Sequence, residues 1–89
     1  MVRITGEVAT DPTARIMEGG TLVVQFCVRT KEGWTQVVMF RTVAERAAAV
    51  LRKGINITLE GILKFSPWSG KDYVTHWSRR LIAIHMEVA

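Results

Sequence analysis

Two aromatic residues share one face of a predicted β-strand, and a pair of cations follows further along the sequence. Side chains alternate across a strand, so Trp34 and Phe40 lie on the same face. The predicted helix that comes next ends in Arg52 and Lys53. Aromatic rings stack on unpaired bases and fixed cations neutralise phosphates, which together is the chemistry of binding single-stranded nucleic acid.

The opposite face of the same strand is also apolar, through Val37 and Met39. A strand in an ordinary two-layer sheet needs only one apolar face for the core. The strand face that carries Trp34 and Phe40 therefore belongs to a second core, an oligomer interface or a ligand platform. The periodicity leaves these three alternatives open.

Length and charge narrow the class of protein. The chain has 89 residues, of which 48% are hydrophobic and 22% charged, and this predicts one folded domain over residues 1–89. Twelve Lys and Arg against eight Asp and Glu give a formal net charge of +4. A basic balance favours an acidic partner such as nucleic acid, with a mildly basic surface as the alternative.

Residue types used in catalysis and metal binding form no recognisable pattern in the sequence. Cys27 is the single cysteine, and neither His76 nor His85 has a further ligand at metal-binding spacing. We interpret Cys27 as a core thiol in a reducing compartment. Paired carboxylates, a nucleophile with its base and a phosphate-cradling glycine loop are not recognisable either. We expect no enzyme, no metal and no cofactor.

The hydropathy pattern predicts a cytoplasmic protein. No stretch approaches the roughly 20 apolar residues of a membrane span, and no signal segment follows Met1. We therefore expect no membrane partner.

The first half of the chain predicts three strands. They cover residues 2–8, with a bend at Gly6, residues 22–30 and residues 34–40. Asp11-Pro12 ends the first strand, and residues 13–20 are expected to form a loop. A tight hairpin at residues 31–33 joins the second strand to the third.

A helix is predicted after the third strand. Thr42 and Glu45 have the spacing of a capping box, which would start the helix. Gly54 is placed to stop it, because glycine readily adopts the left-handed conformation that ends many helices.

The last part of the chain predicts a long two-strand hairpin. The fourth strand begins at Ile55 and bends at Gly61, and the hairpin tip is expected at residues 67–70. The fifth strand runs from about residue 73 to residue 86, with an interruption at residues 78–80. Three strands, a helix and a hairpin fit an all-β, five-stranded OB-fold barrel with one helix between strands 3 and 4.

Several short motifs resemble, in their order and spacing, those of the bacterial single-stranded DNA-binding proteins. Residues 6–15 match G-x-x-x-x-D-P-x-x-R, and residues 34–40 match W-x-x-V-V-x-F. Residues 51–54 read L-R-K-G, and an E-G pair at residues 60–61 precedes Trp68. The resemblance covers nearly the whole chain.

The resemblance implies that the partner is single-stranded DNA, bound without regard to base sequence in replication, repair or recombination. It implies that bases stack on Trp34, Phe40 and Trp68 and that phosphates are neutralised by Arg15, Lys53 and Lys64. Arg52 and Lys71 are further candidate cations. Such binding should weaken as salt rises, and it does not by itself distinguish DNA from RNA.

The chain also departs from the family pattern. The hairpin at residues 31–33 is shorter than the family's, which predicts a smaller binding site. Thr35-Gln36 stands where the family often has His-Arg, which removes a cation from the usual tetramer contacts. A homo-oligomer is expected, and whether it is a dimer or a tetramer is left open. The chain stops at Ala89 without the family's acidic tail, and we expect no partners recruited through such a tail. A bacterial, phage or plasmid origin is expected.

An alternative is a closer relation to the primosomal replication protein PriB. In that case the barrel would bind single strands weakly and act as an adaptor that recruits replication proteins. Of the remaining aromatic residues, Phe26, Phe65 and Tyr73 are assigned to packing, and Trp77 is assigned to the core or to an interface. Arg79 and Arg80 are either a phosphate clamp or a solvated bulge.

Overall fold

A computed structural model describes the backbone of residues 1–89 and every side chain except those of Trp68, His76 and Trp77. The elements are β1 (Val2–Val8), β2 (Thr13–Ile16), β3 (Leu22–Thr30), β4 (Gly33–Phe40), α1 (Arg41–Val50), β5 (Asn56–Ser69) and β6 (Thr75–Val88). The strands follow the order β1-β5-β6-β4-β3-β2, and β1 also pairs with β3, which closes the sheet into a barrel. The barrel and its helix agree with the predicted all-β class, but the strand count is six instead of five.

The additional strand is β2, so the prediction of a loop over residues 13–20 is wrong at its start. Thr13 lies opposite Gln25 and Ile16 opposite Leu22 in an antiparallel pair with β3. All four residues of β2 are exposed. Pairing with the long β3 therefore holds this strand in place, and four residues carry too little pattern for sequence to reveal it.

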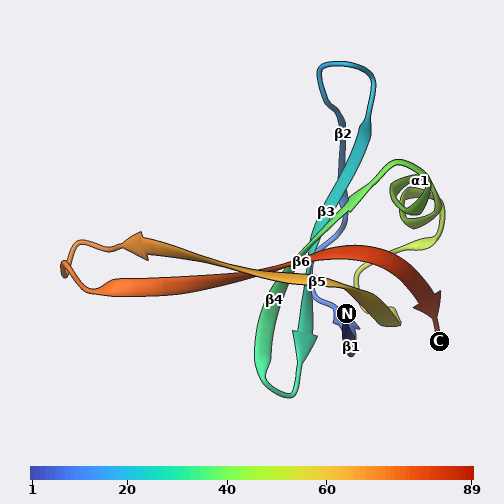
Figure 1. Cartoon of the computed structure of the whole chain (residues 1–89). Helices are drawn as coiled ribbons and strands as arrows, with labels where there is room; N and C mark the ends of the chain where they lie inside the picture. Colours follow the sequence, from blue (N-terminus) through green and yellow to red (C-terminus); the bar gives the residue numbers. More distant parts are fainter.

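The core fills the barrel interior. β3 contributes Val24, Phe26 and Val28, β4 contributes Val37 and Met39, and the closing strands add Val8, Ile57, Leu59 and Leu81, all of them buried. The alternation predicted for β4 is confirmed at Trp34, Val37, Met39 and Phe40, although Val38 is buried on the outer face, and the packing role of Phe26 is confirmed too. Figure 1 shows α1 beside one end of the barrel, where Ala44 and Ala47 are buried and the helix contacts β3, β4 and β6.

The helix begins earlier than the predicted capping box. Its N-cap is Phe40, and no side chain bonds to the free N–H groups there. Arg41 has a φ of 57°, in the left-handed region, so the chain turns directly from β4 into α1. The prediction that Thr42 and Glu45 start the helix is therefore wrong.

The helix also ends earlier than predicted, at Val50, with Leu51 as its C-cap. Gly54 has a φ of 96° and its N–H donates to the carbonyl of Val8 at 2.8 Å. Gly54 thus turns the chain into β5 instead of terminating α1. The Asp11 carboxylate accepts a hydrogen bond from the backbone N–H of Lys53 at 3.2 Å. This bond connects the segment at Asp11-Pro12, which was predicted to end the first strand, to the loop that contains Gly54.

The strands β5 and β6 form a long hairpin whose far half reaches away from the barrel as an arm (Figure 1). The strands pair as far as Ser69 and Thr75, so the tip lies a few residues beyond the predicted 67–70. β6 runs without interruption through residues 78–80, which corrects the predicted break. The register shift lies instead between Glu60 and Gly61, where a bend was predicted.

Candidate nucleic-acid interface

The aromatic side chains of β4 lie on the outside of the barrel. Trp34 is 58% exposed and Phe40 is 38% exposed, whereas Thr35 and Val37 on the opposite face are buried. Strand alternation produces this division. A second core at Trp34 and Phe40 is therefore excluded within the chain, and an interface or a ligand platform remains.

A row of polar and basic residues crosses the strands between the two aromatic residues. Gln36 of β4 lies opposite Arg80 of β6, and Arg80 lies opposite Lys64 of β5. Residues in register on neighbouring strands share a face and are separated by about 4.8 Å between strands. Lys64 and Arg80 are thus adjacent cations on the outer face.

The same row continues to Cys27 of β3, which lies opposite Gln36. Cys27 is half-buried, and it lines a small hollow of about 190 Å³ together with Gln25, Gln36 and Arg80. The interpretation of Cys27 as a core thiol is therefore wrong, because β3 points it outward.

A third cation, Arg15, lies near Phe40. Val23 of β3 is in register with Arg15 of β2 on one side and with Phe40 on the other. Arg15 and Phe40 are therefore two strands apart, a separation of about 10 Å. β2, the strand that sequence did not predict, is what places Arg15 there.

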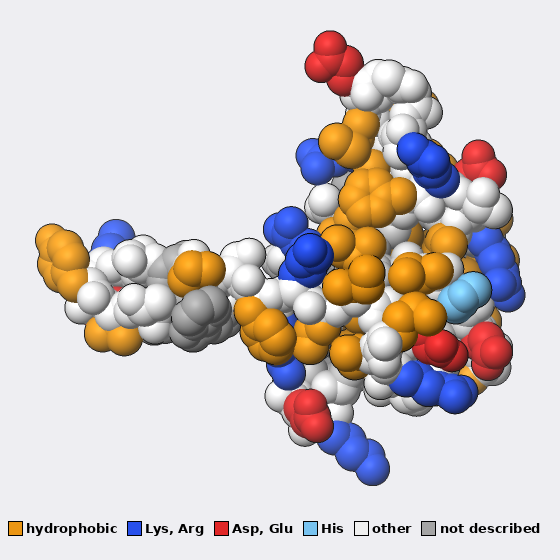
Figure 2. Space-filling view, viewed as in Figure 1, with side chains coloured by type: hydrophobic (Ala, Val, Ile, Leu, Met, Phe, Trp, Pro, Cys, Tyr) orange, Lys and Arg blue, Asp and Glu red, His pale blue; other side chains and the backbone are white. Residues whose placement is uncertain are grey.

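We call these residues the aromatic face: Arg15, Trp34, Gln36, Phe40, Lys64 and Arg80. Trp34 and Phe40 are six residues apart on one strand, or about 20 Å, so they cannot stack on the same base. Figure 2 shows hydrophobic side chains across the middle of this side of the molecule, with Lys and Arg side chains among them near the base of the arm.

Arg29 lies beside the aromatic face but is engaged elsewhere. It is in register with Trp34, and its guanidinium lies 3.0 Å from the carboxylate of Glu7 on β1. Both side chains are about half exposed, so the pair contributes little stability. Its main effect is to offset the charge of Arg29 next to Trp34.

Three of the predicted cations lie elsewhere. Arg52 lines a hollow with Ala14 and Val24, on the opposite side of β3 from Trp34. Lys53 follows it in the same exposed loop, and Lys71 is exposed at the tip of the arm. The structure does not bring these three residues to the aromatic face.

The arm carries further aromatic residues. The prediction for Trp68 concerns a side chain outside the described residues; its backbone belongs to β5 and pairs with that of His76. Phe65 and Tyr73 are both exposed, so their assignment to packing is wrong. The strand alternation that exposes Arg80 was readable in the sequence, but the expected interruption of β6 concealed it.

Metal ligands do not gather among the residues whose side chains are described: no group of three or more His, Cys, Asp or Glu residues is close enough to hold an ion. No helix in the described chain is long and apolar enough to cross a membrane.

Comparison with known proteins decides the family. The model of the family described as "Single-strand binding protein family" matches residues 1–89. The chain belongs to this family. The resemblance inferred from short motifs is thereby confirmed over the whole chain, and the closer relation to PriB is not favoured.

Two curated relatives are named as single-stranded DNA-binding proteins. The single-stranded DNA-binding protein of Neisseria meningitidis serogroup A is 29% identical over 100 residues, which cover 98% of this chain and 58% of that protein. Single-stranded DNA-binding protein 1 of Xylella fastidiosa is 28% identical over 101 residues and is covered to 74%. The chain thus spans just over half the length of the Neisseria relative.

A solved structure confirms the fold. The small single-stranded DNA-binding protein from Streptomyces coelicolor superposes with a TM-score of 0.72 at 20% identity, covering 99% of this chain and 92% of that one. The OB-type barrel of this single-strand binding family member is therefore supported by two observations: its own strand order and its similarity to the solved Streptomyces structure.

Proposed function

We propose that the protein binds single-stranded DNA without regard to base sequence, in replication, repair or recombination. In this proposal the strand crosses the aromatic face and continues along the arm. Bases stack on Trp34, Phe40 and Trp68, and phosphates meet Arg15, Lys64, Arg80 and Lys71. The observation that carries the proposal is the exposure of Trp34 and Phe40 on one face, with Lys64 and Arg80 in the row between them.

The chemistry of this face suits an unpaired strand. A base stacked on an aromatic ring contributes roughly 1–3 kcal/mol whatever the base, because every base has a π-face. Cations between the rings add a term that depends on salt through counterion release. Arg52 and Lys53 can contact phosphates only if the bound DNA continues past β2 to the side of the barrel where α1 lies. The expected homo-oligomer, dimer or tetramer, stays a prediction.

The proposal is tested by titrating labelled oligo-dT and oligo-dA with the protein at several salt concentrations. Comparable affinity for both oligonucleotides and a linear fall of log K with log salt are expected. Double-stranded DNA of the same length is the control ligand and should bind more weakly. A preference for duplex, or no binding at all, would contradict the proposal.

Replacement of one cation should change the salt dependence by a defined amount. We expect Lys64→Gln to make the slope of log K against log salt shallower by about 0.7, the value for one phosphate contact on a single strand. Arg3→Gln is the matched control, because Arg3 is an exposed cation on β1, opposite Glu60, and is not one of the residues of the aromatic face. Equal slopes for the Lys64 variant and the unmodified protein would remove Lys64 from the interface.

A further inference from the structure

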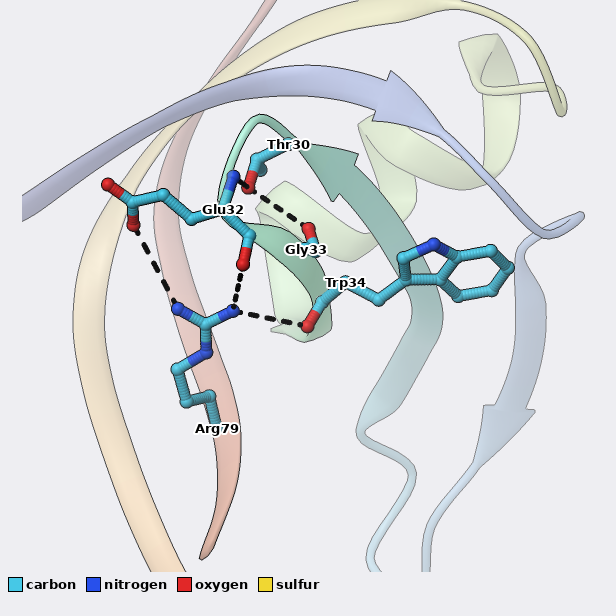
Figure 3. Close-up of polar contacts among 5 residues, drawn as sticks. All are labelled: Thr30, Glu32, Gly33, Trp34 and Arg79. Atoms are coloured by element: carbon cyan, nitrogen blue, oxygen red, sulfur yellow. Dashed lines mark hydrogen bonds and ion pairs between the residues drawn. The ribbon is translucent and has the colours of Figure 1, made fainter.

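Two hairpins that carry candidate stacking residues are joined by one arginine. Arg79 lies in β6 at the base of the arm, and its side chain reaches the turn between β3 and β4. One guanidinium nitrogen, Nη2, donates to the backbone carbonyls of Glu32 and Trp34, each at 3.5 Å. A second guanidinium nitrogen, Nη1, lies 4.0 Å from the Glu32 carboxylate. Figure 3 shows the three contacts converging on the one side chain.

The turn that Arg79 contacts is also ordered from within. The hydroxyl of Thr30 donates to the carbonyl of Gly33 at 3.0 Å and accepts from the N–H of Glu32 at 3.1 Å. These bonds fix the shape of the turn but do not fix its position relative to the arm. Arg79 supplies a link to β6, and one of its two acceptors is the backbone of Trp34 itself (Figure 3).

The link lies just beyond the end of the strand pairing. The parallel ladder between β4 and β6 starts at Gln36 and Arg80 and runs to Val38 and Ile82. Trp34 therefore precedes the ladder by two residues. A planar guanidinium with several fixed donors can hold two carbonyls at once, which a lysine ammonium does with less directional precision.

The two consecutive arginines point to opposite sides of β6. Arg80 lines the outer hollow with Gln36. Arg79 instead shares a cleft of about 550 Å³ with Thr35 and Leu63, at the mouth of the barrel. The Arg79 side chain is 31% exposed, compared with 85% for Glu32, so the guanidinium is the more enclosed of the pair.

We propose that Arg79 is a positioning residue: it holds the β3–β4 turn, and with it Trp34, at a fixed place relative to the arm. Arg80 contacts phosphate, whereas Arg79 acts through Trp34. This inference rests on the proposed function, because a fixed geometry between Trp34 and the arm matters only if one strand of DNA contacts both.

The test compares Arg79→Lys with the matched control Arg3→Lys, at an exposed cation of β1 that is not part of the aromatic face. Both changes keep the charge, but only the first removes the planar fork that holds the turn. Oligo-dT affinity should fall roughly two- to ten-fold for Arg79→Lys, the range for loss of such contacts, with an unchanged salt slope. For Arg3→Lys the affinity and the salt slope should both stay unchanged, because Arg3 has no part in the proposed interface.

A double-mutant cycle separates positioning from a general loss of structure. In a Trp34→Ala background the effect of Arg79→Lys should largely disappear, since the residue that it positions is gone. In the free protein, amide hydrogen exchange at residues 31–35 should be faster in Arg79→Lys and unchanged in Arg3→Lys. Glu32→Gln should change both readouts little, because the two carbonyl contacts remain.

Three results would overturn the role of Arg79. One is an Arg79→Lys protein that binds and exchanges like the unmodified protein. Another is an affinity loss that persists undiminished in the Trp34→Ala background. The third is an Arg79→Gln protein in which the slope of log K against log salt becomes shallower by about 0.7 and Trp34→Ala still causes its full loss of affinity. That result would assign Arg79 to phosphate contact. An unmodified protein that fails to bind oligo-dT would instead contradict the proposed function, and the role of Arg79 with it.

Discussion

Replacing Trp34 with alanine should weaken oligo-dT binding roughly five- to 150-fold, the equivalent of losing one stacked base. The large exposed fraction of Trp34 means that its removal opens no cavity, so the melting temperature should hardly change. Fluorescence anisotropy of a labelled oligonucleotide measures the affinity, and thermal unfolding by circular dichroism measures the stability.

Two matched variants sharpen this result. Trp34→Phe keeps a π-face and should recover much of the lost affinity. Val50→Ala removes an exposed apolar side chain from α1, away from the aromatic face, and should leave binding unchanged. If Trp34→Ala bound oligo-dT as well as the unmodified protein but lowered the oligomeric state, Trp34 would be an interface residue and not a stacking platform.

Replacing Gly61 with alanine should give the largest loss of stability, at least about 3 kcal/mol. A Cβ at this position would collide with the carbonyl oxygen of Ile82 and come within 2.8 Å of the Cα of Ala83. Both atoms belong to the backbone of β6, which cannot move without disturbing the pairing that supports the arm. In a domain of this size the melting temperature should fall by roughly 10 °C or more.

Gly54→Ala is the matched control for Gly61→Ala. A Cβ on Gly54 meets nothing within 4 Å, but its φ of 96° strains any other residue. The expected loss is therefore about 1 kcal/mol, from backbone conformation alone. Urea unfolding gives both free energies. Similar losses for the two variants would show that the β5–β6 backbone yields easily at Gly61.

The outward position of Trp34 and Phe40 could be predicted from sequence because it depends only on strand alternation. The position of Arg15 could not. It depends on β2, a short exposed strand that exists because β3 offers it an edge, and that is a tertiary effect. The sequence left two roles open for Arg80, a phosphate clamp or a solvated bulge, for a related reason: an uninterrupted β6 points it outward, whereas a predicted break left its direction open.

The start of the helix shows how a local pattern can be overridden. Thr42 and Glu45 have the residue types of a capping box, but Arg41 turns the chain in the left-handed region and α1 begins before the box. The contact between Arg79 and the β3–β4 turn is also invisible in sequence, since it joins residues more than 40 positions apart.

The central claim is that single-stranded DNA lies against the aromatic face, and its most direct test uses Trp34 as the only tryptophan. In a protein carrying Trp68→Phe and Trp77→Phe, tryptophan emission is followed during titration with oligo-dT at low and high salt. We predict that oligo-dT strongly quenches Trp34 emission at low salt, and that a higher oligo-dT concentration is needed for the same quenching as salt rises. Binding detected by anisotropy without any change in Trp34 emission would contradict the account.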